Sequence, residues 1–182
     1  MLSEAERPII VAGGGAADVG SGLADLAAHL DAPVFTTING KGILPPGHRL
    51  ALAGNLGMDA AQAELEASDV VLAIGTEFGE TEMYPAARQI EIKGKLIRID
   101  IDPLQIVNQL PADIAITADS ALAVAALNDA LGSAAGQARK GAERAAATRK
   151  KIAAKLWPAC KTHVCRRLFA GRGGGKHARP PA

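Results

Sequence analysis

The chain has 182 residues, enough for one substantial hydrophobic core and a small additional segment. Hydrophobic residues make up 48% of the chain but aromatic residues only 3%. The core must therefore consist mainly of Ala, Val, Ile and Leu, as is usual where helices cover a parallel sheet. Twenty Lys and Arg against nineteen Asp and Glu give a net charge of +1, which argues against nucleic acid or an anionic membrane as a partner.

The N-terminal sequence MLSEAERPII lacks the apolar core of a signal peptide, and no apolar run approaches the roughly 20 residues of a membrane helix. Cys160 and Cys165 have the spacing C-x4-C, which differs from the CxxC of redox and zinc motifs. We therefore expect a soluble, cytoplasmic protein whose two thiols are reduced.

The first part of the chain alternates between short apolar runs and amphipathic stretches. The run at 8–12 predicts a buried strand that ends on glycine, and the leucines within 18–31 have helical spacing. A second strand is expected at 32–37, where proline stands at the opening. A long connection rich in glycine and proline, at 38–57, precedes a predicted helix at 58–68.

The same alternation continues toward residue 132. Residues 69–75 predict a third strand that again ends on glycine, and 95–102 predict a fourth. A short helix at 103–109 has proline in its first turn. A fifth strand at 113–119 is followed by a helix at 120–132 that stops at glycine.

This order of elements predicts a doubly wound, mostly parallel sheet between two layers of helices, an α/β/α arrangement. We expect that domain to span residues 1–132. Residues 133–157 are rich in Ala, Lys and Arg and predict a solvated helical linker. Residues 158–182 are rich in glycine and basic residues without periodicity, which predicts a disordered tail.

The stretch GGGAADVG at 13–20 joins the first strand to the following helix. Glycines at such a corner let backbone N–H groups approach a phosphate, and the helix adds the positive end of its dipole. Gly20 comes two positions late for GxGxxG, however, and the chain has no GxxxxGK[ST]. The spacing leaves two interpretations open: a nucleotide phosphate site, or the tight turn that the fold requires.

Carboxylates follow two further strands. Asp100 and Asp102 are predicted on the same face of one strand end, and Asp119 follows the fifth strand. In sheets of this kind, ligands bind at the carboxyl ends of the strands, where a carboxylate can accept hydrogen bonds from ribose hydroxyls.

Other constellations carry less chemistry. The chain contains neither GxSxG nor HExxH. Glu77, Glu80 and Glu82 gather after the third strand, either as an acid/base or metal site or as a solvated acidic loop. His29 and His48 are expected to be ordinary surface or capping residues.

Four segments, RPIIVAGGGA, PVFTTINGKGILP, SDVVLAIGTEFGE and GKLIRIDIDP, occur in the order and spacing of a known family. Together they resemble the central domain of thiamine-diphosphate-dependent enzymes such as acetolactate synthase, pyruvate oxidase and benzoylformate decarboxylase. The resemblance covers about residues 5–132. TTINGKG and GTEFGETE are most similar to acetolactate-synthase-like proteins that decarboxylate 2-oxoacids, such as the guanidino-oxopentanoate decarboxylase of arginine catabolism.

The resemblance implies a six-stranded Rossmann-like sheet within a parent enzyme of three domains. Thiamine diphosphate and Mg²⁺ would be held by the two neighbouring domains, which would be this domain's partners in a homo-oligomer. The parent would decarboxylate a 2-oxoacid and transfer or release the aldehyde unit. The family's GDG motif with its later double Asn has no counterpart here, and the glutamate that activates thiamine belongs to the first domain. We therefore expect no catalytic residue in this chain, and no activity from it alone.

Some family members bind FAD or ADP in this domain. On the family pattern, the contacts would fall at Gly13, Gly14, Gly15, Thr37, Gly57, Met58, Gly75, Thr76, Asp100, Ile101 and Asp119. FAD-binding members tend to carry arginines after the third strand, whereas this chain has the three glutamates and no cation there. Because carboxylates repel a diphosphate, the sequence disfavours FAD and ADP and favours an empty, vestigial site.

The sequence thus supports a scaffold domain of a larger enzyme, with a free-standing nucleotide-binding module as the alternative. Sirtuins, which are dinucleotide-dependent deacetylases, have a related sheet. They are disfavoured because the chain lacks a zinc cysteine quartet and a histidine in a matching motif.

Overall fold

The computed structural model describes residues 1–52, 56–79, 90–132 and 139–160. Within these ranges the chain forms a parallel sheet with the strand order β2-β1-β3-β4-β5. The strands are β1 (Pro8–Ala12), β2 (Val34–Thr36), β3 (Val70–Ile74), β4 (Lys95–Asp100) and β5 (Ile114–Thr117). All five lie within the ranges predicted from apolar periodicity, and the doubly wound parallel architecture is confirmed.

The number of strands differs from the six that the resemblance implied, because the described residues form five. Beyond β2, where another strand would lie, Ala51 pairs with Val34 in a single parallel bridge. Val34 N donates to Leu50 O at 2.8 Å, and Leu52 N donates to Val34 O at 2.9 Å. Among the described residues, 50–52 therefore cover the β2 edge through a single bridge and two hydrogen bonds.

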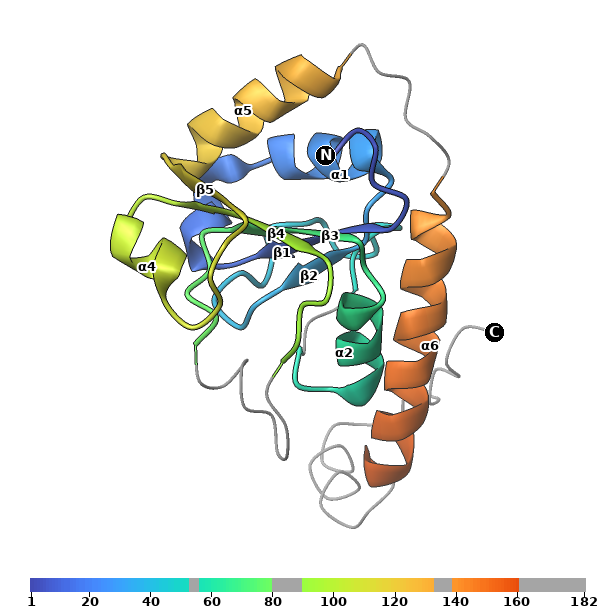
Figure 1. The fold of residues 1–182 in the computed structure, drawn as a ribbon. Helices are drawn as coiled ribbons and strands as arrows, with labels where there is room; N and C mark the ends of the chain where they lie inside the picture. The colour runs from blue at the N-terminus through green and yellow to red at the C-terminus, as the bar shows by residue number, and fades with distance from the viewer. Residues whose placement is uncertain (53–55, 80–89, 133–138, 161–182) are drawn as a thin grey trace, which may run out of the picture.

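The helices lie on both faces of the sheet (Figure 1). On one face are α1 (Gly22–Leu30) and α5 (Ser120–Leu131), and on the other are α2 (Asp59–Glu66) and α6 (Gly141–Cys160). A short helix, α4 (Pro103–Val107), lies beside β4 and β5. The predicted helix at 18–31 is preceded by a 3-10 segment, η1 (Gly14–Val19), and its apolar stripe is buried as expected.

Alternation along the central strands divides the core into two halves. In β1, Ile10 and Ala12 pack toward α1 and α5, whereas Ile9 and Val11 pack toward α2 and α6. Successive side chains of a strand point to opposite faces, so the five residues of β1 contribute side chains to both halves of the core. This is why the strand is a continuous apolar run rather than an alternating one.

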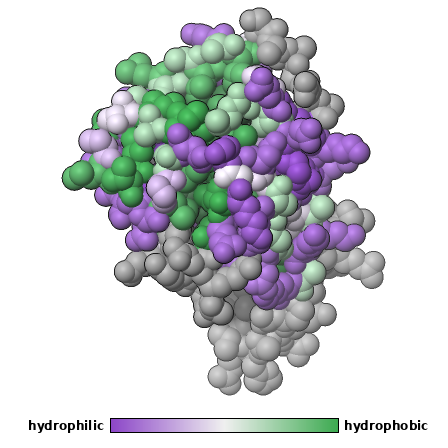
Figure 2. All heavy atoms as spheres, viewed as in Figure 1, coloured by the Kyte–Doolittle hydropathy of each residue, from purple (hydrophilic) through white to green (hydrophobic). Residues whose placement is uncertain are grey.

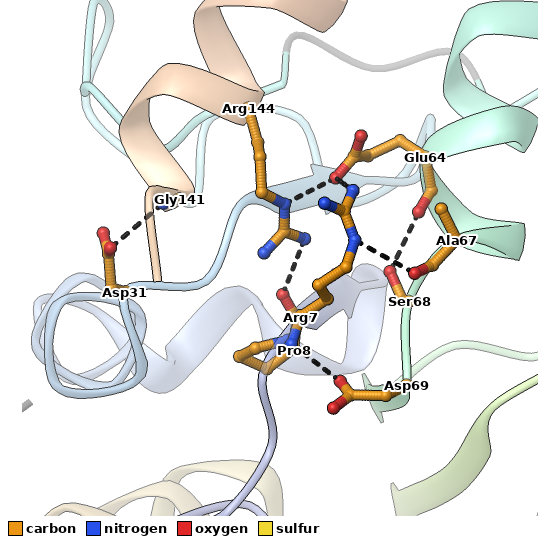
Figure 3. Close-up of polar contacts among 9 residues, drawn as sticks. All are labelled: Arg7, Pro8, Asp31, Glu64, Ala67, Ser68, Asp69, Gly141 and Arg144. Carbon is orange, nitrogen blue, oxygen red and sulfur yellow. Dashed lines mark hydrogen bonds and ion pairs between the residues drawn. The ribbon is translucent and has the colours of Figure 1, made fainter. Parts of the chain in front are cut away.

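Helix α6 has a buried face, which differs from the solvated helix that its composition predicted. Ala145, Thr148 and Ile152 are buried, and Arg144 is only 9% exposed. Arg144 Nε donates to Glu64 Oε1 at 2.7 Å, and its Nη2 donates to the Pro8 carbonyl at 3.0 Å. Arg7 Nη2 donates to the same Glu64 oxygen at 3.3 Å (Figure 3). One carboxylate of α2 therefore binds an arginine that precedes β1 and an arginine of α6.

Asp31 fixes the start of α6. Its Oδ2 accepts a hydrogen bond from Gly141 N at 3.0 Å (Figure 3). The same oxygen accepts from Arg139 N at 2.9 Å. A side chain on Gly141 would collide with the Asp31 carbonyl, so the helix begins at glycine because the two backbones approach closely.

No helix in the described ranges is both long and apolar enough to cross a membrane. Several predictions fall on residues outside these ranges: Glu80, Glu82, Cys165 and the part of the predicted tail at 161–182.

Candidate functional site

The carboxyl ends of the strands form a row of loops, and the glycine corner after β1 stands at its centre. Gly13 N donates to Ile74 O at 2.9 Å, and Gly15 N donates to Gly75 O at 3.0 Å. A side chain on Gly13 would collide with the Gly75 carbonyl and lie 2.7 Å from Thr76 Cα. Two N–H groups that could face a phosphate therefore already donate to the end of β3.

Gly75, which follows β3, packs its backbone against Gly15 of the glycine corner. Its φ of +54° lies in the left-handed region, and an added Cβ would stand 2.6 Å from Gly15 Cα. Both properties favour glycine, and both arise from the approach of two backbones. The strand order reverses between β1 and β3, which is where ligands bind in sheets of this type. Here the two strand ends are joined at that point by backbone hydrogen bonds.

The loop after β2 joins the row in the same way. Thr37 N donates to Ala12 O at 2.9 Å, and Gly40 N donates to the Thr37 carbonyl at 3.1 Å. A Cβ on Gly40 would collide with the Ala12 carbonyl. The glycines of three loops are thus explained by backbone packing, which supports the tight-turn interpretation of the glycine corner.

The carboxylates at the later strand ends act within the fold. Asp100 Oδ1 accepts from Asp102 N at 3.0 Å, and Asp102 Oδ1 accepts from Leu104 N at 2.8 Å at the start of α4. Asp119 Oδ1 accepts from the N–H groups of Ala121 and Leu122 at the start of α5. Asp102 and Asp119 are therefore N-caps, a role that their position before a helix could have indicated.

Arg98 is a buried cation beside the loop after β3 that the sequence analysis missed. It is 1% exposed, and its guanidinium carbon lies 5.3 Å from the centroid of the Phe78 ring. Its Nη2 donates to Thr76 O at 2.9 Å, and its Nη1 donates to the carbonyls of Asn108 and Leu110 at 2.7 and 3.0 Å. Burial lowers the pKa of Arg98, and the nearby Asp100 opposes this shift.

The sequence analysis expected no cation near the loop after β3, and Arg98 corrects that expectation. Its guanidinium already donates hydrogen bonds to three backbone carbonyls. The available signal was an arginine between isoleucines in IRI at 97–99, a polar residue in an otherwise buried strand. Of the three glutamates predicted to rim the site, Glu77 is described, and its side chain is exposed.

The structure brings most of the predicted contact residues into one row. Gly13, Gly15, Gly75 and Thr76 are in direct backbone proximity, and Thr37 is tied to the end of β1. Gly75 N donates to Ile99 O at 2.8 Å, and Ala118 N donates to Asp100 O at 3.0 Å, which extends the row to Asp119.

The other four predicted residues are placed as follows. Gly14 faces Asn39 and is exposed, and Ile101 is 71% exposed. Gly57 and Met58 precede α2, where Met58 packs against the core. Whether any of these residues contacts a nucleotide stays a prediction.

His29 and His48 have structural contacts. His29 Nδ1 lies 3.2 Å from Asn128 Oδ1 and links α1 to α5, and His48 Nδ1 accepts from Leu50 N at 3.4 Å. Across the described part of the chain, no three His, Cys, Asp or Glu side chains gather in a way that could hold a metal ion.

Known proteins match this chain both as a family and individually. The family model described as the central domain of thiamine pyrophosphate enzymes matches residues 1–127. A probable 2-ketoarginine decarboxylase of Pseudomonas aeruginosa is 35% identical over 162 residues, which are 89% of this chain and 29% of that protein.

Two further relatives match a similar region. A probable acetolactate synthase large subunit of Methanocaldococcus jannaschii is 40% identical over 124 residues, 66% of this chain and 21% of that protein. A glyoxylate carboligase of Escherichia coli O157:H7 is 39% identical over 138 residues, 70% of this chain and 22% of that protein. The chain thus spans less than a third of the length of these relatives.

Proposed function

Because the chain belongs to the family of thiamine pyrophosphate enzyme central domains, we propose that it is the scaffold domain of a larger 2-oxoacid-decarboxylating enzyme. The relatives are named as decarboxylase, acetolactate synthase and carboligase, which supports a parent that decarboxylates a 2-oxoacid and transfers or releases the aldehyde unit. 2-Ketoarginine is a guanidino-oxopentanoate, so the first of these names agrees with the subgroup that TTINGKG and GTEFGETE resemble.

Thiamine diphosphate, when bound, supplies the electron sink for decarboxylation. The described residues do not fit its Mg²⁺, since they contain no cluster of metal ligands. We therefore assign thiamine diphosphate and Mg²⁺ to neighbouring domains of the parent, which are also this domain's proposed partners in the cytoplasm. No catalytic step is assigned to a residue of this chain.

The observation that carries the scaffold proposal is the closure of the strand ends. A phosphate cradle needs N–H groups that point into open space, yet Gly13 N and Gly15 N both donate to the end of β3. The guanidinium of Arg98, a buried cation beside this loop, is occupied by three carbonyls. These contacts favour a strand-end surface that holds FAD or ADP weakly or not at all.

An activity assay tests the scaffold proposal. The purified chain is mixed with thiamine diphosphate, Mg²⁺ and either pyruvate or 2-ketoarginine, and release of CO₂ is followed. We expect no release above that of the cofactor mixture without protein. Sustained turnover by the chain alone would overturn the assignment, because it would place the thiamine chemistry within these residues.

The alternative is a nucleotide-binding module without catalysis. It is favoured by the position of Asp100 and Asp119 in one row at the carboxyl ends of the strands, where nucleotides bind in related sheets. Micromolar affinity for ADP without any effect of thiamine diphosphate would favour this alternative over the scaffold.

A further inference from the structure

The long connection between β2 and α2, at 38–57, returns to the edge of the sheet with few contacts of its own. Within it, Ala51 forms one parallel bridge with Val34, and two backbone hydrogen bonds accompany that bridge. A contact of this size holds a segment weakly, because each net hydrogen bond contributes little to stability. The position of the connection therefore depends on what bonds it from its outer side.

The outer side of Ala51 is bonded by helix α6. In a trans peptide the C=O and the N–H point in opposite directions, and the described ranges contain no cis peptide bond. Since Leu50 O and Leu52 N are bonded to Val34, the N–H and the carbonyl of Ala51 point away from β2. That outward carbonyl accepts a hydrogen bond from Arg149 Nη1 at 2.5 Å.

Arg149 belongs to the inward stripe of α6. Ala145, Thr148 and Ile152 are buried, and Arg149 shares their helical spacing of three and four residues. Arg149 Nη1 also donates to the carbonyl of Arg49 at 3.1 Å, so one nitrogen of the helix bonds two carbonyls of the connection. Figure 2 shows mainly hydrophilic atoms on the side of the molecule where α6 lies, so the inward stripe is what attaches this helix.

A second contact joins the connection to the start of α6. Arg49 Nη1 lies 3.7 Å from Asp31 Oδ1, while Asp31 Oδ2 accepts from the N–H of Gly141, the first residue of the helix, at 3.0 Å. Residues 49–51 are thus linked to α6 at two positions along its length, through Asp31 at its start and through Arg149 about two turns later.

We propose that α6 is a strap that holds the connection between β2 and α2 on the edge of the sheet, with Arg149 as the residue that positions it. The strap and residues 49–51 open together as one local unit, while β4 and β5 stay folded. Because the connection begins beside Thr37, in the row of strand-end loops, the strap also limits how far that row opens. The inference rests on these contacts and is independent of the scaffold proposal.

Amide hydrogen exchange of the full chain, followed by NMR, measures this opening. The edge amides are those whose hydrogen bonds surround the bridge: Val34, Ala51 and Leu52. The reference amides donate to residues of β4 on the other side of the sheet: Asp113 and Ala118.

Arg149→Met removes the clamp. We expect exchange of the edge amides to become at least about tenfold faster, because two hydrogen bonds from a charged donor are lost, and the reference amides to be unchanged. Lys150→Met is the matched control, since it removes the same charge at the next, exposed position of α6 and should change neither set. Unchanged edge amides in Arg149→Met, or equal acceleration of both sets, would overturn the proposal.

Ile152→Ala tests whether α6 acts as a whole. Ile152 is 7% exposed and has no side-chain hydrogen-bonding group, so its truncation loosens the packing of the helix without removing a polar contact. The strap predicts that the edge amides again exchange faster while the reference amides do not. If only Arg149→Met had this effect, that residue would act without the rest of the helix and the strap would be refuted. Neither variant is assayed with thiamine diphosphate, so failure here leaves the scaffold proposal standing.

Discussion

Gly15 and Gly75 are joined through their backbones, because Gly15 N donates to the Gly75 carbonyl at 3.0 Å. The two residues belong to loops that follow β1 and β3, at the point where the strand order of the sheet reverses. A nucleotide site at such a point uses the same glycines and the same N–H groups. In this chain the N–H groups of Gly13 and Gly15 hold the two loops together, which supports the proposed scaffold role.

Gly13→Ala tests whether the glycine corner is closed. The new Cβ would collide with the Gly75 carbonyl, and we expect a loss of at least about 2 kcal/mol in the free energy of unfolding, as for other overpacked sites. Gly79→Ala is the matched control, because nothing lies within 4 Å of a Cβ there. Urea denaturation measures both. Equal stability of the two variants would show that the corner has room.

Arg98→Met tests the buried cation. The substitution leaves the carbonyls of Thr76, Asn108 and Leu110 without their donor, and each buried unpaired group costs about 1–3 kcal/mol. We expect a loss of at least about 2 kcal/mol in the same denaturation experiment. Arg49→Met, at a side chain that is 59% exposed, should change stability by less than about 0.5 kcal/mol. A small effect at Arg98 would mean that water replaces the guanidinium.

Arg144→Met tests the attachment of α6. The Arg144 and Glu64 side chains are 8% and 12% exposed, and removing one partner of a buried pair costs about 3–5 kcal/mol. Lys155→Met removes a pair of the same helix whose side chains are 61% and 83% exposed, and it should cost less than about 1 kcal/mol. Similar losses for the two variants would argue that α6 adds little to the folded unit.

Asp113 should make stability depend on pH in the acid range. The hydrogen bond from Lys95 is the main cause of its lowered pKa, and the N–H of Leu96 adds to the shift. A lowered pKa in the folded state stabilises the protein at pH above the unfolded value of 3.8, and this contribution is lost as the pH falls through the folded value. The difference in urea midpoint between the natural chain and Asp113→Asn should therefore shrink below pH 3.8. A constant difference would contradict the shift.

The sequence predicted the five strands and α1 because their signals are local. Apolar runs such as 8–12 and 70–74 are continuous where both faces of a strand are buried, and the leucine spacing of α1 places one stripe on the core. The doubly wound parallel architecture and the family also followed from the succession of these segments. No property of distant residues was needed for any of these predictions.

The remainder depended on contacts between distant residues. Composition made α6 look solvated, because three of its buried residues, Arg144, Ala145 and Thr148, are small or polar. The partner of Arg144, Glu64, lies 80 positions away in the sequence. Asp119 is the exception, because its N-cap contacts with Ala121 and Leu122 are local and its position before α5 could have indicated them. Whether Asp119 also contacts a ribose stays a prediction. For Arg98, three carbonyls from two loops make burial acceptable, and no local pattern encodes that arrangement.

Calorimetric titration of the folded chain with FAD, and separately with ADP, tests most directly whether the strand ends are closed to nucleotides. We expect no saturable heat and no rise in unfolding temperature with either ligand at about 100 μM. A ligand with a dissociation constant of about 1 μM would stabilise the chain by about 2.7 kcal/mol at that concentration. Stoichiometric binding of FAD that Gly13→Ala abolishes while the variant stays folded would contradict the closure and make this surface a flavin site.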